Sequence, residues 1–320
     1  MKPNANPILI GIIAGLVAAI GTAGSMVMPF FAQLVGMTAL FMAGLGFGRV
    51  AGLIAVATAA IALGAFTSSL FLTFIFGVTL LPAALMSHLA SLARPASEIG
   101  GPDTAIAWYP LSDILLAGAI VTAIATICLL VLQPMDPLFA EIVEEVTKMF
   151  TEASPGTTFT AEQKAQAVEM LKTFGPFSQS AGNLVMLFAG FYFAMVILSA
   201  MRRNVRPRED IRASLRMNRM SIVIFLGGIA LMFVGGTAGI IGASFAGAVG
   251  GGFLLSGFAV IHYALREKSY ALPALVLAYL VTFILPPAGL LVAIAGGLAN
   301  PRRAIALTPH KSNETSETEN

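Results

Sequence analysis

The sequence predicts an all-α, polytopic integral membrane protein, a bundle of about eight to ten transmembrane helices. Two observations support this fold class. The first is composition: of 320 residues, 57% are hydrophobic and only 11% are charged, whereas soluble domains carry about 25% charged residues. The second is a succession of apolar stretches, each close to the roughly 20 residues that a helix needs to cross a bilayer.

Nine apolar stretches are candidates for these helices. The first resembles a signal peptide, but it is longer than a typical h-region and more spans follow, so we interpret it as an uncleaved helix. The last is interrupted by Pro286 and Pro287, which remove backbone donors and break a helix. It is either a hairpin of two short helices, 271–285 and 287–299, or one kinked helix, and the hairpin is preferred. The stretches are 8–28, 30–47, 50–67, 69–91, 112–133, 181–201, 220–235, 239–265 and 271–299.

The distribution of charge predicts how the bundle is oriented. Segment 202–219 holds seven arginines and two acids, so the positive-inside rule places it in the cytoplasm. Segment 134–180 holds seven acids and three lysines, which places it outside. We therefore expect a multi-pass protein of the bacterial cytoplasmic (inner) membrane with a cytoplasmic N-terminus.

Four parts follow from these assignments. Residues 1–133 form an N-terminal bundle of five spans, and residues 134–180 form an extracytoplasmic amphipathic helical hairpin. Residues 181–305 form a C-terminal transmembrane bundle, and residues 306–320 form a disordered cytoplasmic tail, because the end of the chain is polar. The hairpin either lies on the membrane surface or caps the bundle, or it covers an external site as a lid. Its second helix is expected to start after Thr160, where Gln163 has capping-box spacing.

The sequence carries no recognisable catalytic chemistry. No acidic or basic residue lies in the middle of any span, and neither a zinc-protease nor a Walker A motif occurs. Ser244 and His262 lie about 27 Å apart if one helix carries both, too far to share a proton. Cys128 is the only cysteine and the three histidines are scattered, so no metal site and no cofactor are expected. The protein is predicted not to be an enzyme, and no residue is assigned a catalytic or metal-binding role.

A few polar residues near the spans are candidates for binding a small molecule. They are Gln33, Arg49, Trp108, Asn183 and His262. The arginine-rich segment is expected to meet anionic lipid headgroups, and no nucleic acid is expected as a partner.

The first helix carries a small-residue face, which allows close helix approach. Gly11 and Gly15 are four residues apart, as are Ala14 and Ala18. This face either packs inside the protein or docks another membrane protein.

Several stretches resemble the YybS-like family of uncharacterised polytopic bacterial membrane proteins, a domain-of-unknown-function family. The resemblance covers most of residues 1–305 and implies no catalytic residues. The stretches are Met28-Pro-Phe-Phe-Ala32, Gly46-Phe-Gly-Arg49-Val-Ala-Gly52-Leu-Ile-Ala55, Ala107-Trp-Tyr-Pro110, Phe253-Leu-Leu-Ser-Gly-Phe-Ala-Val-Ile-His262 and Ala295-Gly-Gly-Leu-Ala-Asn-Pro-Arg302-Arg303.

The family is distantly similar to the substrate-binding S components of energy-coupling-factor vitamin transporters. In those proteins a small-residue face of the first helix docks the energising module, a role that the resemblance assigns to Ala14 and Ala18. It therefore implies an S-component-like transport subunit that binds a small molecule and lacks its own energy source. The alternative is a non-transporting scaffold or assembly factor that docks other proteins.

Overall fold

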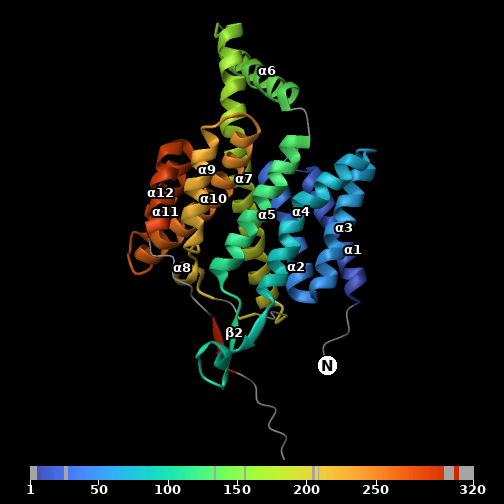
Figure 1. Cartoon of the computed structure of the whole chain (residues 1–320), viewed down its shortest axis with the longest axis vertical. Coiled ribbons are helices and arrows are strands. Elements are labelled where there is room, and N and C mark those ends of the chain that lie inside the picture. The colour runs from blue at the N-terminus through green and yellow to red at the C-terminus, as the bar shows by residue number, and fades with distance from the viewer. Residues whose placement is uncertain are drawn as a thin grey trace, which may run out of the picture.

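The computed structural model describes residues 6–24, 28–132, 135–154, 156–203, 206–207, 209–298 and 306–309. Within these residues the chain forms twelve α-helices, one short 3-10 helix and three short strands (Figure 1). The helices are α1 (Pro7–Gly24), α2 (Pro29–Phe47), α3 (Arg49–Phe66), α4 (Leu70–Ala90), α5 (Leu111–Leu132), α6 (Met135–Ala153), α7 (Ala161–Ala200), α8 (Ile211–Ser214), α9 (Met220–Met232), α10 (Gly236–Leu265), α11 (Ala271–Ile284) and α12 (Pro286–Leu298). The 3-10 helix is η1 (Ala96–Ile99), and the strands are β1 (Ala93–Pro95), β2 (Ala105–Trp108) and β3 (Leu307–Pro309).

Seven of these helices are long and apolar enough to cross a membrane, namely α1 to α5, α7 and α10. The count reaches eight if α11 and α12 are taken together as one bent span. The predicted all-α polytopic bundle is therefore confirmed, with seven or eight candidate spans among the described helices where about eight to ten were expected. α9 has the position of the predicted span 220–235, but it has only 13 residues and covers about 20 Å at 1.5 Å per residue.

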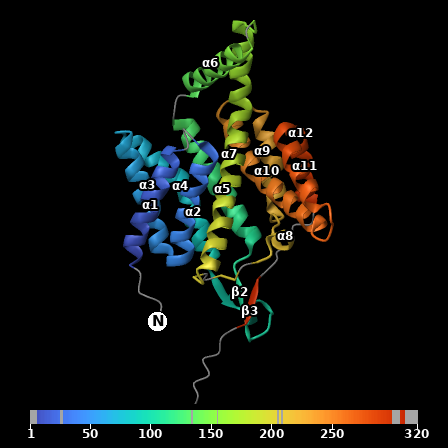
Figure 2. The same ribbon diagram turned by 180° about the vertical axis from the view of Figure 1, so that it is seen from behind.

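The helices run between two ends of the bundle that differ in structure (Figures 1 and 2). We call the end that carries the three strands and α8 the sheet end. The opposite end, where α6 and the first part of α7 project beyond the other helices, is the α6 end. α1 begins at the sheet end, and α1 to α5 alternate in direction. α7 and α10 both run from the α6 end to the sheet end, because the short α9 between them returns the chain to the α6 end.

Close helix contacts depend on glycine in two places. A Cβ at Gly15 of α1 would lie 2.5 Å from the carbonyl oxygen of Ala55 in α3. A Cβ at Gly247 of α10 would overlap the backbone of Phe177 in α7. Because backbone atoms cannot rotate away as a side chain can, larger residues at these positions would force the helices apart. α10 is the hub of the C-terminal half and contacts α5, α7, α9 and α12.

α7 is a single helix of 40 residues, where the sequence predicted a hairpin helix followed by a separate span from residue 181. Its start agrees with the prediction: Thr160 and Gln163 form the capping box, with hydrogen bonds of 3.2 and 2.9 Å. Pro176 lies inside the helix and is buried. The helix continues through this proline, and at about 60 Å it is twice as long as the hydrocarbon core is thick. Its first part therefore projects at the α6 end (Figure 1).

The last apolar stretch consists of two helices, the preferred one of the two predicted alternatives. α11 and α12 meet at an angle of 116°. Both ends of this helical pair lie near the sheet end, because His262 near the end of α10 lines a pocket together with α8, and β3 pairs with β2. With 14 and 13 residues, each helix covers about 20 Å, less than the roughly 30 Å core.

The three strands form an antiparallel sheet in the order β1-β2-β3. Ala93 pairs with Trp108, and Ala107 pairs with Leu307. This finding corrects the prediction of a disordered tail over 306–320, since residues 307–309 are a strand; residues 310–320 lie outside the described part of the chain. Strands of three or four residues are too short to show the alternation that identifies a strand in a sequence.

Candidate binding sites at the two ends of the bundle

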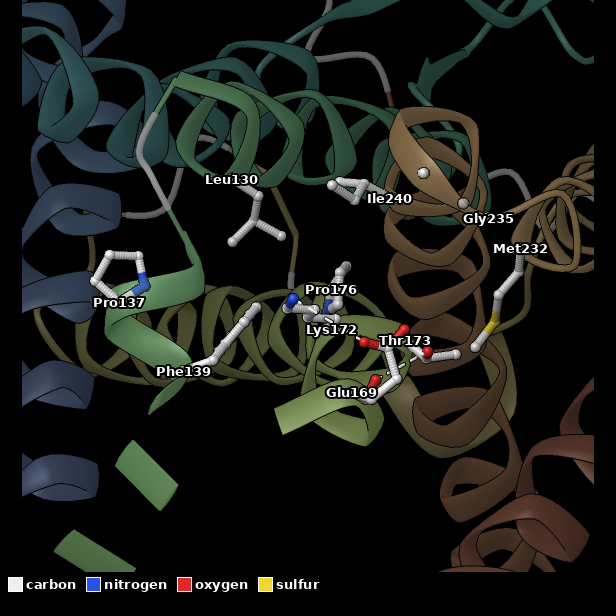
Figure 3. Close-up of a pocket in the computed structure, with 12 residues that line it drawn as sticks. Leu130, Pro137, Phe139, Glu169, Lys172, Thr173, Pro176, Met232, Gly235 and Ile240 are labelled. Carbon is white, nitrogen blue, oxygen red and sulfur yellow. Dashed lines mark hydrogen bonds and ion pairs between the residues drawn. The ribbon is translucent and has the colours of Figure 1, made fainter. Parts of the chain in front are cut away.

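A pocket of about 550 Å³ lies at the α6 end, and we call it the α6 pocket (Figure 3). Four parts of the chain enclose it: the end of α5 with Leu130, the start of α6 with Phe139, the middle of α7, and the turn between α9 and α10. Pro176 of α7 and Ile240 of α10 add to its apolar wall. Helices that are far apart in sequence thus form one concave surface.

One wall of the α6 pocket is polar and comes from successive turns of α7. The ammonium of Lys172 lies 4.0 Å from the carboxylate of Glu169. The hydroxyl of Thr173 donates a hydrogen bond of 3.1 Å to the carbonyl oxygen of Glu169. The facing wall is the α9–α10 turn, where Gly235 and Gly236 have φ angles of 75° and 56°, values that favour glycine. The pocket therefore offers a cation, an anion and a hydroxyl opposite a turn that contains two glycines.

α6 packs on α7 with one part of its apolar face. Phe139 and Val143 are buried, and Lys164 of α7 forms an ion pair of 2.7 Å with Glu144 of α6. Ile142, Val146, Met149 and Phe150 remain exposed. The helix is thus fixed at one edge of the pocket and keeps an apolar face that the described part of the chain leaves uncovered.

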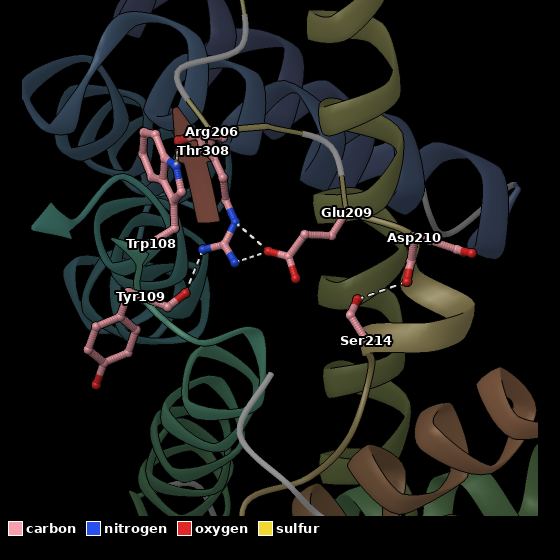
Figure 4. A network of polar contacts seen from close by, with 7 residues as sticks. All are labelled: Trp108, Tyr109, Arg206, Glu209, Asp210, Ser214 and Thr308. Carbon is pink, nitrogen blue, oxygen red and sulfur yellow. Dashed lines mark hydrogen bonds and ion pairs between the residues drawn. The ribbon is translucent and has the colours of Figure 1, made fainter. Parts of the chain in front are cut away.

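A polar network centred on a buried arginine holds the sheet end together (Figure 4). Arg206 is only 3% exposed. Its Nε and Nη2 atoms donate to the carboxylate of Glu209, and Nη1 donates a hydrogen bond of 2.6 Å to the carbonyl oxygen of Tyr109. The indole Nε1 of Trp108 donates to Oγ1 of Thr308 over 2.9 Å. Three distant segments, before α5, after α7 and after α12, are joined in this way.

A second large pocket, of about 810 Å³, lies at the sheet end between α7, α8, α10 and α11; we call it the sheet-end pocket. The ring of Tyr279 in α11 stacks on Phe258 in α10 with centroids 4.2 Å apart. The hydroxyl of Tyr279 lies 2.9 Å from Nε2 of His262. Asp210 and Arg212 form an ion pair of 3.2 Å at α8. The pocket combines aromatic walls with charged groups.

The predicted binding residues do not converge on one site. His262 lines the sheet-end pocket, and Trp108 lines a smaller pocket of about 370 Å³ beside β2. Gln33 is half-buried in α2, and Arg49 is exposed at the start of α3. Asn183 of α7 accepts a hydrogen bond of 3.0 Å from Gln179. Gln33, Arg49 and Asn183 line neither the α6 pocket nor the sheet-end pocket.

The small-residue face of the first helix is occupied within the chain. Ala18 is 1% exposed, and a Cβ at Gly36 of α2 would lie 3.1 Å from its carbonyl oxygen. Ala14 is half-buried against the core. A Cβ at Gly11 would lie 2.8 Å from the carbonyl oxygen of Ala51 in α3. Ala14 and Ala18 therefore pack largely within the chain, the first of the two alternatives for this face.

Apart from His262, sequence reasoning missed the residues that line the two large pockets. Glu169, Lys172 and Thr173 follow the spacing i, i+3, i+4, which places side chains on one helix face, and this signal was available. Tyr279 gave no signal, because one tyrosine in an apolar stretch is indistinguishable from a packing residue.

Among the described residues, no group of three His, Cys, Asp or Glu side chains is placed to hold a metal ion.

The sequence pattern of a family described as "Predicted membrane protein (DUF2232)" matches residues 7–298. The chain belongs to this family. The matched region includes all twelve helices, so the family assignment applies to the whole bundle and agrees with its apolar spans. Comparisons with curated proteins and with solved structures gave no match.

Proposed function

We propose that the protein is a non-enzymatic transport subunit of the bacterial inner membrane, which binds a small molecule in the α6 pocket and relies on a partner protein for energy. One observation carries this proposal: a pocket of about 550 Å³ with polar groups on one wall. Sites for small molecules are typically concave, mostly apolar clefts of about 300–1,000 Å³ with a few placed polar groups. The resemblance to S components of energy-coupling-factor transporters supplies the transport role by analogy.

Charge supports an orientation in which the α6 pocket faces outside. Arg202, Arg206 and Arg212 lie at the sheet end, whereas Glu141 and Glu145 lie on α6. The positive-inside rule then assigns the sheet end and the start of α1 to the cytoplasm. A solute would reach the α6 pocket from outside and pass α6. This helix is attached to α7 on one side only, as expected of a lid.

The lining predicts the chemical class of ligand. Leu130, Phe139 and Ile240 suit an apolar body, while Glu169 and Lys172 offer an acceptor and a donor. The two charges form an ion pair, so the wall has no net charge that would select an ion of one sign. A small, largely apolar molecule with one or two hydrogen-bonding groups fits best.

The test is native mass spectrometry of the protein purified gently from its own membrane. The wild type is expected to carry a small molecule or a co-purifying membrane subunit. Gly239 lines the pocket, and a Cβ there would lie 3.4 Å from its nearest neighbour, so Gly239→Leu fills the pocket without a backbone clash. Gly227→Leu on α9 is the matched control, because a Cβ there meets nothing within 4 Å.

The proposal predicts that Gly239→Leu loses the small molecule while Gly227→Leu keeps it. Retention by Gly239→Leu at the wild-type level would show that the molecule binds elsewhere. A wild-type protein that carries only lipid and no partner would argue against the transport subunit as a whole.

One observation favours a second function, that of a scaffold or assembly factor. α6 leaves Ile142, Val146, Met149 and Phe150 exposed, and apolar faces that stay uncovered often mark interaction sites. Replacing Ile142 and Met149 with serine would remove part of this face without disturbing the buried Phe139. The scaffold predicts loss of co-purifying proteins with ligand retention unchanged, whereas the transport subunit predicts retained partners.

A further inference from the structure

The polarity of the sheet-end pocket changes with depth in the membrane. α10 ends at Leu265, and at 1.5 Å per residue His262 lies about 4.5 Å from that end. Phe258 and Leu255 line the same pocket about 10 and 15 Å from the end. Half of the hydrocarbon core is about 15 Å thick. The pocket is thus polar near the membrane surface and apolar along one leaflet, which is the polarity profile of a lipid.

The charged groups of the pocket are balanced. The carboxylate of Glu209 is bound by the buried Arg206. The remaining pair, Asp210 and Arg212, has one charge of each sign, and both side chains are about half exposed, at 53% and 56%. A headgroup with a single negative charge would be attracted by Arg212 but repelled by Asp210. A headgroup with both signs complements both residues.

The pocket is bordered by a helix that is only lightly attached. α11 contains no buried residue, and its Tyr279 contacts both Phe258 and His262 of α10. Tyr192 of α7 also lines the pocket. Aromatic faces attract ammonium groups by cation–π interaction.

We infer that the sheet-end pocket binds a zwitterionic phospholipid of the adjacent leaflet, with a headgroup of the phosphoethanolamine type. Its phosphate lies near Arg212, its ammonium near Asp210 and Tyr192, and one acyl chain follows Leu255 and Phe258. The lipid fills the space between α11 and the rest of the bundle. This site is separate from the α6 pocket and independent of any transported solute.

The experiment measures lipid retention by native mass spectrometry of delipidated protein in detergent. Palmitoyl-oleoyl phosphatidylethanolamine and palmitoyl-oleoyl phosphatidylglycerol are titrated separately, and soluble glycerophosphoethanolamine is added as a competitor without chains. Arg212→Gln is the test variant, and it is expected to affect folding little because the Arg212 side chain is half exposed. Arg203→Gln is the matched control, because Arg203 is at the same end but lies over the ring of Phe47, outside the pocket.

Wild type is expected to retain phosphatidylethanolamine over phosphatidylglycerol. Arg212→Gln should weaken this retention about tenfold, the equivalent of one charge-assisted hydrogen bond, while Arg203→Gln stays within about twofold of wild type. Equal retention of both lipids, or equal losses in both variants, would overturn the site in favour of diffuse attraction to headgroups. Full displacement by glycerophosphoethanolamine would show that the pocket takes a soluble phosphoamine and no lipid chain.

Discussion

Replacing Arg206 with methionine should destabilise the sheet end far more than replacing any exposed arginine nearby. The guanidinium is 3% exposed and donates to Glu209 from two nitrogens and to the carbonyl oxygen of Tyr109 from a third. Its loss leaves the Glu209 carboxylate, 13% exposed, without this cation. Removing one partner of a buried ion pair costs about 3–5 kcal/mol, because a charge stays buried without compensation.

The single tryptophan makes this effect directly measurable. Trp108 is the residue before Tyr109 and is bonded to Thr308, so its fluorescence reports on the sheet end. Unfolding in mixed micelles with increasing dodecyl sulfate would give the free energy of unfolding for each variant. Arg212→Gln is the control, since its ion pair is half exposed and should contribute at most about 1 kcal/mol.

A double variant separates charge from shape. Arg206→Met combined with Glu209→Leu removes both charges, and most of the lost stability should return, because an apolar pair of similar size is often as stable as a buried ion pair. If Arg206→Met costs no more than Arg212→Gln, the reasoning from burial is refuted. If the double variant is as unstable as Arg206→Met, the bond to Tyr109 carries the stability instead.

Two further predictions concern packing and orientation. Gly247→Leu should destabilise the bundle by about 1–3 kcal/mol, because the new side chain would overlap the backbone of α7. In the same unfolding assay Gly227→Leu should stay within about 0.5 kcal/mol of wild type. Equal effects of the two variants would contradict the close approach of α10 to α7. In a Cys128→Ala background, an impermeant maleimide should label Glu145→Cys in intact cells and Arg219→Cys only after permeabilisation. The reverse labelling would turn the α6 pocket toward the cytoplasm.

Most helices that are long enough to span the membrane were predictable from the sequence, because a long apolar stretch marks each of them. The expected spans 30–47, 50–67 and 112–133 differ from α2, α3 and α5 by one residue at most at each end. The break at Pro286 and Pro287 also predicted two helices correctly. The continuity of α7 through Pro176 was not predictable, because a proline removes one backbone donor and only the surrounding packing decides whether the helix continues.

The sites were harder to predict than the spans, for a physical reason. The α6 pocket brings Leu130, Phe139, Thr173 and Gly235 together from four elements, and such long-range proximity leaves no local pattern. The sequence analysis treated Arg206 like the other arginines of segment 202–219, as part of the positive charge of the sheet end. In the structure Arg206 is buried and paired with Glu209. His262 was chosen correctly as a residue that lines a pocket, but its role stays a prediction.

The pairing of β2 with β3 has a consequence for biosynthesis. Trp108 and Thr308 are 200 residues apart in the chain, and ribosomes add about 5–20 residues per second. The outer edge of β2 therefore lacks its partner strand for about 10–40 s after Trp108 has been synthesised. During this time an unpaired strand edge is open to pairing with other chains. The nascent chain would therefore be protected if a chaperone or the adjacent membrane surface shielded that edge until β3 is synthesised.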